Sequence, residues 1–250
     1  MLFERYGEKE KLVGFEPIYL DQIKGVELMN RIDTKYVIER GVLNEILPQL
    51  TEEYWALEVE GTKMNAYATQ YFDTSDFKFY LDHHNGKGNR FKVRIRKYIE
   101  SDIYFLEVKN KFKGRTEKKR IRIGDFEEKL SEGSKEYVEA VVGDQLVLNS
   151  KLWNSFDRVT LVNKKLKERL TIDMNLSYQF EEDSFEFNHF VIAELKQEKI
   201  NRSSLFYKVM KKYGIRPNSF SKYCVGAITL NPFLKANNFK KHMLLIDKLQ

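Results

Sequence analysis

The sequence predicts an α+β fold in which about eight antiparallel strands close into a barrel with a charged interior, flanked by helices. Three observations support this prediction. Outside the segments with helical spacing, most of the chain alternates between polar and apolar side chains, the period of two that is typical of strands. Successive strands carry Arg and Lys on corresponding faces, and segments with helical spacing are few.

Six segments show the alternation clearly, and each has a charged face and an apolar face. They are residues 31–38, 91–98, 104–111, 118–123, 168–174 and 190–198. In the second segment, Arg94 and Arg96 lie opposite Val93 and Ile95, because neighbouring side chains of a strand point to opposite sides. For any single strand, an antiparallel sheet with one solvated face would give the same pattern.

These charged faces are far more basic than the chain as a whole. With Arg158 included they carry thirteen basic residues against five acidic ones, whereas the chain has 43 Lys and Arg against 37 Asp and Glu. Small barrels usually fill their interior with apolar side chains, so a charged interior predicts a bound polyanion and water. The few carboxylates on these faces are candidate ligands of Mg²⁺ or Mn²⁺ beside phosphate oxygens.

Four segments are expected to be helical. They are residues 42–54, where apolar side chains recur at helical spacing, residues 134–148, residues 203–213 and residues 220–230. The third begins with a candidate serine cap and ends before Gly214. Around a charged barrel, such helices would cover the apolar outer faces of the strands.

The composition excludes several classes of protein. With 42% hydrophobic and 32% charged residues, the chain is globular rather than disordered or fibrous. No apolar run reaches the ~18 residues of a membrane helix, and the charged residues that follow Met1 are unlike a signal peptide. The single cysteine, Cys224, excludes an internal disulfide and fits the reducing cytosol, so we expect a cytoplasmic protein.

Nine short motifs carry a resemblance to a known family. In order, they are residues 31–36 (RIDTKY), 71–74 (YFDT), 92–98 (KVRIRKY), 105–109 (FLEVK), 118–120 (KKR), 156–158 (FDR), 169–173 (RLTID), 193–196 (AELK) and 221–223 (SKY). As an ordered set, they resemble the triphosphate tunnel metalloenzymes, a CYTH-like superfamily. Within that superfamily they resemble the VTC (vacuolar transporter chaperone) domain of polyphosphate polymerases.

The resemblance covers about residues 27–230 and implies one tunnel domain over residues 1–250, with a C-terminal tail at 231–250. It implies a stand-alone, bacterial-type polymerase that transfers the terminal phosphate of ATP or another triphosphate to a growing polyphosphate chain. Mn²⁺ or Mg²⁺ would be the cofactor, nucleic acid would not be a ligand, and a membrane-bound partner protein could bring the chain to a membrane. The sequence leaves the oligomeric state open.

The resemblance also assigns roles to individual residues. Those at the reacting phosphates are Lys35, Arg94, Arg96, Lys109, Arg158 and Arg169. Further phosphate contacts are Arg31, Lys118, Arg120, Lys196, Ser221 and Lys222, and the metal ligands are Glu194 and Glu107. Two positions depart from the family pattern: Phe156 stands where a tyrosine is common, and Ser219 stands where a basic residue is expected.

Alternative interpretations stay open at this point. The same tunnel could hydrolyse inorganic or nucleoside triphosphate, although Arg31 replaces a carboxylate that is usual in the first strand of related hydrolases. A non-catalytic sensor of polyphosphate or nucleotide is a third function. Nucleic-acid binding is disfavoured because few aromatic residues accompany the basic ones on the same face. Glu194 could also form an ion pair with a neighbouring cation instead of holding a metal.

Overall fold

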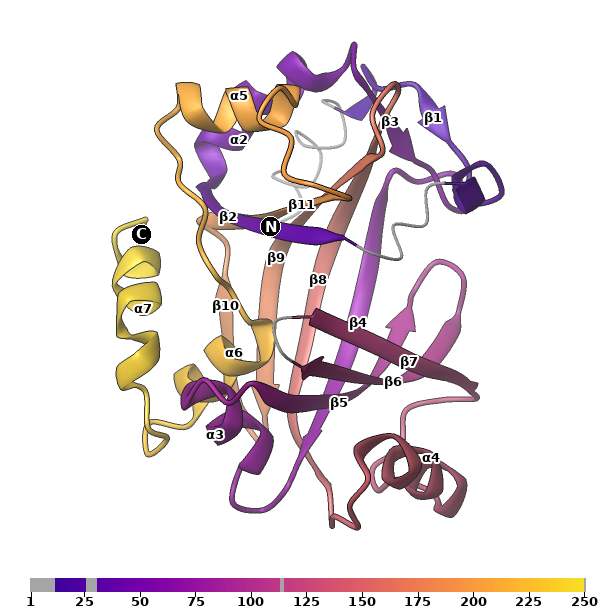
Figure 1. Cartoon of the computed structure of the whole chain (residues 1–250), viewed down its shortest axis with the longest axis vertical. Coiled ribbons are helices and arrows are strands. Elements are labelled where there is room, and N and C mark those ends of the chain that lie inside the picture. The colour runs from indigo at the N-terminus through magenta and orange to yellow at the C-terminus, as the bar shows by residue number, and fades with distance from the viewer. Residues whose placement is uncertain (1–11, 26–30, 113–114, 250) are drawn as a thin grey trace.

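The computed structural model describes residues 12–25, 31–112 and 115–249 (Figure 1). Its centre is a curled antiparallel sheet in which eight strands follow one another in the order β2-β11-β9-β8-β4-β5-β6-β7. These strands are β2 (Ile32–Glu39), β4 (Met64–Asp73), β5 (Asn89–Tyr98), β6 (Ile103–Phe112), β7 (Arg115–Ile123), β8 (Asn149–Asn163), β9 (Glu168–Phe180) and β11 (Phe190–Gln197). Three short strands extend the sheet: β1 (Pro17–Ile18), β3 (Tyr54–Leu57) and β10 (Asp183–Phe187).

The six predicted strands are all present, and the two long strands that prediction missed are β4 and β8. Both lie near the middle of the sheet and are buried along most of their length. A strand covered on both faces does not need alternating polarity, so its sequence lacks the signal that marked the others.

The sheet differs from the predicted closed barrel. Among the described residues it is an open half-barrel, because its end strands β2 and β7 do not pair with each other. The free edge of β2 has another partner, since the backbone N–H of Asn218 donates to the carbonyl of Lys35 at 2.8 Å. Both edges also carry basic side chains, Lys35 on β2 and Lys118 with Arg120 on β7.

The four predicted helices are shorter than expected, and two further helices of the described chain lie outside the predicted segments. The helices are α2 (Arg40–Ile46), α3 (Lys78–His84), α4 (Glu132–Val142), α5 (Leu205–Lys212), α6 (Lys222–Leu230) and α7 (Lys240–Asp247), with 3₁₀ turns η1 (Gln22–Gly25), η2 (Leu47–Leu50) and η3 (Asn237–Phe239). The helix expected over residues 42–54 ends early because Pro48, which lacks a backbone N–H, starts η2. Serine side chains cap α4, α5 and α6 as N-caps.

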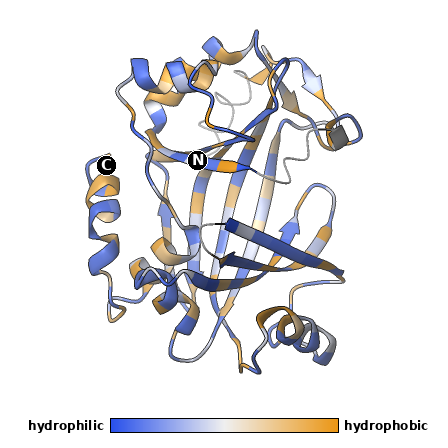
Figure 2. Cartoon of the chain, viewed as in Figure 1, coloured by the Kyte–Doolittle hydropathy of each residue, from blue (hydrophilic) through white to orange (hydrophobic). Residues whose placement is uncertain are grey.

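Helices cover both faces of the sheet, in different places (Figure 2). On the convex face, α2 and α5 bury the apolar side of β2, β9 and β11, where Tyr36 and Ile172 are fully packed. Also on this face, α4 packs against β5 and β6 around Val138. On the concave face, α6 lies inside the half-barrel and packs against β8 and β9, in an apolar cluster that also includes Tyr67 and Tyr71 of β4.

Gly226 explains how closely α6 approaches the floor of the half-barrel. A Cβ atom at this position would lie 2.3 Å from the ring of Tyr178 and 2.8 Å from the side chain of Leu152. Only glycine therefore fits between the helix and strands β8 and β9. The helix fills one end of the concave face and leaves the charged part of that face beside its N-terminus.

Candidate phosphate-binding basin

The charged part of the concave face, called the basin below, is formed by strand register. Pairing places Lys35 beside Glu194, Arg169 beside Lys196, Arg158 beside Asp173, and Arg94 beside Glu107. The basin consists of Lys35, Lys92, Arg94, Arg96, Glu107, Lys109, Arg158, Arg169, Asp173, Glu194, Lys196 and, from α6, Lys222. All six residues predicted to act at the reacting phosphates belong to it.

Each of the three carboxylates in the basin is held by two cations. Glu107 accepts from Nε and Nη2 of Arg94 at 2.8 and 2.6 Å, and its other oxygen accepts from Lys118 at 3.2 Å. Asp173 accepts from Nε and Nη2 of Arg158 at 2.5 and 2.8 Å, and it also accepts from Lys222.

Glu194 completes this pattern. One of its oxygens pairs with Lys35 at 2.8 Å and the other with Lys196, whose ammonium also donates to the Thr171 hydroxyl at 3.1 Å. Burial opposes ionisation of Glu194, but Lys196 and Lys35 outweigh it and hold its pKa well below the usual range. The ion-pair interpretation of Glu194 therefore describes this arrangement.

The other two carboxylates are also ionised despite their burial. Arg94 and Arg96 hold the pKa of Glu107 well below its usual value, against the effect of burial. Arg158 and Lys222 do the same for Asp173. Two positive charges around each negative one leave every one of these clusters with an excess of positive charge.

Four further cations in the basin have no carboxylate partner among the described residues. Lys109 has neither a hydrogen bond nor an ion pair, and the buried Nε of Arg169 has no acceptor. Arg96 donates only to the Thr69 hydroxyl at 3.2 Å, and Lys92 only to the Ser221 hydroxyl at 2.8 Å. Side chains of this kind are suited to bind oxygen atoms of an anion.

Burial and neighbouring positive charges lower the pKa values of several cations in the basin. Arg94 and burial together hold the pKa of Lys109 well below its usual value. Burial lowers the pKa of Lys196 to about 8, in spite of Glu194 beside it. Burial also lowers the pKa values of Lys92, Arg96 and Arg169. An anion in the basin would raise all of these values, so anion binding is coupled to proton uptake.

Aromatic rings form the floor between the cations. Tyr67 and Phe156 stack with their centroids 5.2 Å apart and their planes almost parallel. The guanidinium of Arg96 lies 5.5 Å from both ring centroids, and that of Arg158 lies 5.1 and 5.2 Å from them. The ammonium of Lys222 lies 4.6 Å from the Phe156 ring. Cation–π contacts therefore hold three cations in place without neutralising them.

Residues predicted as site residues at the N-terminus of α6 lie at the basin. Ser221 is the N-cap, and its hydroxyl accepts from the backbone N–H of Cys224 as well as from Lys92. Lys222 follows it and reaches Asp173. Ser219, where a basic residue was expected, instead lies 2.6 Å from the His242 ring of α7.

Three predicted phosphate contacts, apart from Ser221, lie outside the basin as defined. Lys118 is exposed on β7, and its ammonium reaches Glu107 at 3.2 Å. Arg31 is exposed at the start of β2 and pairs with Asp33 at 2.9 Å. Arg120 is exposed on the end strand β7, with its guanidinium 4.3 Å from the Phe105 ring. Residues that the prediction left out of the site are Lys92, Asp173 and Tyr67. Lys92 and Asp173 share the charged strand faces, whereas nothing in the sequence marks Tyr67.

The donors in the basin do not make a preformed site for a divalent cation. Among the described residues, no group of three or more His, Cys, Asp or Glu side chains could hold a metal ion. Both oxygens of Glu194 and both oxygens of Glu107 are already taken by cations. Either carboxylate would have to release a cation before it could bind a metal.

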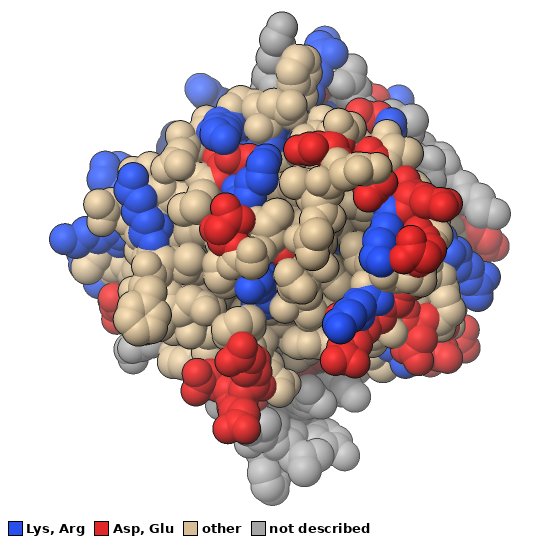
Figure 3. All heavy atoms as spheres, turned by 90° about the horizontal axis from the view of Figure 1, so that it is seen from below, with Lys and Arg blue, Asp and Glu red and all other residues tan. Residues whose placement is uncertain are grey.

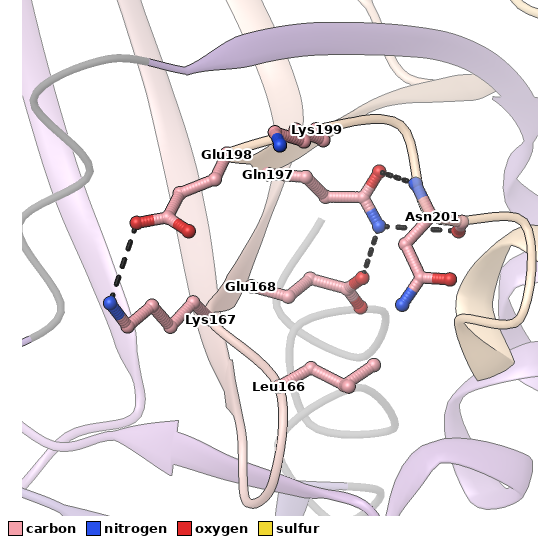
Figure 4. Close-up of a pocket in the computed structure, with 7 residues that line it drawn as sticks. All are labelled: Leu166, Lys167, Glu168, Gln197, Glu198, Lys199 and Asn201. Carbon is pink, nitrogen blue, oxygen red and sulfur yellow. Dashed lines mark hydrogen bonds and ion pairs between the residues drawn. The ribbon is translucent and has the colours of Figure 1, made fainter.

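The charge of other surfaces is mixed. The face in Figure 3, seen from below the view of Figure 1, carries basic and acidic side chains. A pocket of about 270 Å³ lies where β9 begins and β11 ends (Figure 4). Among the residues that line it, Lys167 forms an ion pair with Glu198 at 3.4 Å. The carboxylate oxygens of Glu168, also in the lining, accept hydrogen bonds from Tyr54, Ser204 and Gln197. Glu168 thereby ties the start of α5 to the strands, and the pocket contains no basin residue.

Comparison with known proteins identifies the family of this chain. A family model described as VTC domain matches residues 30–231. The chain belongs to the VTC domain family. Comparison with curated protein sequences gave no match.

Solved structures share the fold of this VTC domain. A candidate adenylate cyclase from Bacillus halodurans is 13% identical, with a TM-score of 0.53 and coverage of 83% of this chain and 100% of that one. A candidate adenylyl cyclase from Hippeastrum, with a dominant triphosphatase activity, is 14% identical, with a TM-score of 0.50 and coverage of 78% and 94%. At these identities the likeness shows the fold alone, a curled antiparallel half-barrel with flanking helices.

Within the described part of this VTC domain, no helix combines the length and the apolar character that crossing a bilayer requires.

Proposed function

We propose that this VTC domain binds the phosphate chain of ATP in the basin and transfers the terminal phosphate to a growing polyphosphate chain. The observation that carries the proposal is the set of cations without a carboxylate partner, Lys92, Arg96, Lys109 and Arg169, on one concave face. Membership of the VTC family supports the same substrate class.

Phosphoryl transfer suits such a surface. Its transition state spreads negative charge over the phosphate oxygens, and catalysis depends on positioning and charge stabilisation more than on a reactive side chain. In the proposal, Lys35, Arg94, Arg96, Lys109, Arg158 and Arg169 hold the reacting phosphates. Lys196, Ser221 and Lys222 extend the contacts toward α6, and Arg31, Lys118 and Arg120 extend them toward the open edges of the sheet.

Binding would proceed by exchange of partners. Arg94, Arg158, Lys35 and Lys196 are held in position by carboxylates, and each carboxylate has two cations to share. A phosphate oxygen can take over one cation while the other keeps the carboxylate neutralised. The carboxylates therefore orient the cations without cancelling their attraction for the substrate.

A metal ion fits this proposal only after such an exchange. Glu194, with Glu107 as a second ligand, stays the predicted binding residue for Mn²⁺ or Mg²⁺, and release of Lys35 or Lys118 to phosphate would free a carboxylate oxygen. When bound, a divalent ion would neutralise charge on the phosphate oxygens. The membrane-bound partner protein that the resemblance implies also stays a prediction.

We further propose that a polyanion draws the half-barrel closed. Lys118 and Arg120 of β7 face the same side as Glu107 and are exposed, while Arg31 and Lys35 belong to the other end of the sheet. A chain of phosphates would attract the cations of both edges. Amide hydrogen exchange should then slow in β7 when inorganic triphosphate is added, while exchange in α4 on the convex face stays unchanged. Equal exchange in β7 with and without triphosphate would contradict closure.

Hydrolysis of triphosphate is the second candidate function. It is supported by the triphosphatase activity of the Hippeastrum protein, which shares the fold. A hydrolase would place water where the polymerase places the end of the acceptor chain. A third outcome, binding without turnover, would make the domain a sensor of polyphosphate or nucleotide.

One assay separates the three functions. Purified protein is incubated with ATP and Mn²⁺, and the products are resolved on a gel stained for polyphosphate. A ladder supports the polymerase, free phosphate without a ladder supports the hydrolase, and tight binding without either product supports the sensor. Arg96→Ala should abolish the activity, and Arg202→Ala is the matched control because Arg202 is exposed and is not a basin residue.

A further inference from the structure

Tyr71 lies beside the basin and has no role in the predicted site or in the proposed function. It lies on β4 opposite Arg94 of β5, and its side chain is almost fully buried, with 4% of its surface exposed. Its ring stacks on Tyr223 of α6 with the centroids 5.1 Å apart. The hydroxyl oxygen accepts a hydrogen bond from Nη1 of Arg94 at 3.4 Å.

The proton of this hydroxyl has no acceptor among the described residues, because the only hydrogen bond of Tyr71 is the one that it accepts. The groups that face it are nearly all cations: Arg94, Arg96 and Lys92 from β5, and Lys222 from α6. The remaining titratable neighbours are Tyr223 of α6 and Tyr178 of β9. A buried donor surrounded by positive charge is well suited to donate to an anion.

We propose that the Tyr71 hydroxyl donates a hydrogen bond to an oxygen of the phosphate chain held by Arg94 and Arg96, and so positions that phosphate. The inference rests on the proposed function and adds a neutral donor to a site made of cations. Arg94 fixes the oxygen of the hydroxyl, and stacking on Tyr223 fixes the ring, so the O–H is already oriented when the anion arrives.

The ionisation of Tyr71 supports this geometry. Burial raises the pKa of the phenol, but Arg94 and Arg96 outweigh burial and bring it below its usual value. In contrast, burial raises the pKa of Tyr178 well above the usual value, and its hydroxyl has no partner. Of the two buried phenols, only Tyr71 lies in the field of the arginines.

The test compares Tyr71→Phe with Tyr178→Phe, since each removes one buried hydroxyl and keeps the ring. Binding of inorganic triphosphate is measured by calorimetry at neutral pH, with the melting temperature as a check of folding. Tyr71→Phe should bind about tenfold more weakly, the loss expected for one hydrogen bond to a charged group, and Tyr178→Phe should bind like the parent. Equal affinity of Tyr71→Phe and the parent would overturn the inference.

A spectroscopic measurement gives a second readout that a purely structural role would not move. In the parent, the phenolate absorbance of one tyrosine should rise at lower pH than the rest, and triphosphate should suppress that rise by neutralising the arginines. The Tyr71→Phe variant should lack this component. A component that persists in the variant, or that ignores triphosphate in a parent that binds it, would contradict the proposal. If the parent does not bind triphosphate at all, the proposed function itself fails.

Discussion

The two ends of the concave face are made by the same strands but have opposite character. At one end, α6 covers Tyr178 and Leu152, which are buried in an apolar cluster. At the other end, the same strands β8 and β9 present Arg158 and Arg169. The two ends meet at Phe156, which belongs to the apolar cluster and also lies under Lys222 and Arg158. Strand alternation therefore selects the concave face, and α6 decides which part of it stays free to bind an anion.

The comparison predicts that the charged end governs binding. Arg96→Ala should weaken the binding of inorganic triphosphate by about 2–4 kcal/mol, because it removes a buried guanidinium with no carboxylate partner. Calorimetry measures the effect. The fold should not lose stability to the same extent, because burial already disfavours this charge. Unchanged affinity would mean that this face of β5 does not contact the anion.

The apolar end should govern stability. Gly226→Ala would push a methyl group into the Tyr178 ring and should lower the free energy of unfolding by about 1–3 kcal/mol. Denaturant unfolding measures the loss. Gly133→Ala is the matched control, since nothing lies within 4 Å of its added Cβ atom. If both variants unfold like the parent, the close contact of α6 with the floor is wrong.

Glu194 affects both stability and activity, because it is a counter-ion of two lysines and also the predicted metal ligand. In Glu194→Gln, Lys35 and Lys196 lose their carboxylate, so the free energy of unfolding should fall by about 1–2 kcal/mol. Triphosphate should still bind, since the two ammonium groups become free for phosphate. If Glu194 also holds a metal, metal-dependent turnover should fall by orders of magnitude. A lower melting temperature with unchanged turnover would discard Glu194 as the metal ligand.

The smallest expected effect is a pH dependence that belongs to the charged end alone. A bound anion raises the depressed pKa values of Lys196, about 8 in the free protein, and of Lys109, so binding takes up protons. Affinity for triphosphate should therefore fall as the pH rises above about 8, by at most roughly tenfold per pH unit for each proton. Lys196→Arg, which keeps its charge in this range, should flatten the profile. An affinity that rises with pH would contradict the coupling.

Much of the basin was predictable because strand periodicity is local. Residues two apart on a strand share a face whatever the strand pairs with, so Arg94 with Arg96 and Glu194 with Lys196 could be placed together from the sequence. The same two-residue repeat revealed the excess of Lys and Arg on these strand faces, which indicated that an anion binds there. It failed at β4 and β8, where both faces are buried and the alternation is lost.

Strand register and contacts between distant segments were decided only by the tertiary structure. Asn175, with φ of 53°, lies where the register of β8 and β9 shifts, so that Asp173 points to the basin and Leu176 still packs under α6. The sequence by itself determined which side chains share a strand face, because that depends only on the two-residue repeat. Only the fold decided that each carboxylate receives two cations, that α6 enters the half-barrel and that β2 and β7 stay apart, because these depend on register and contacts between residues distant in the chain.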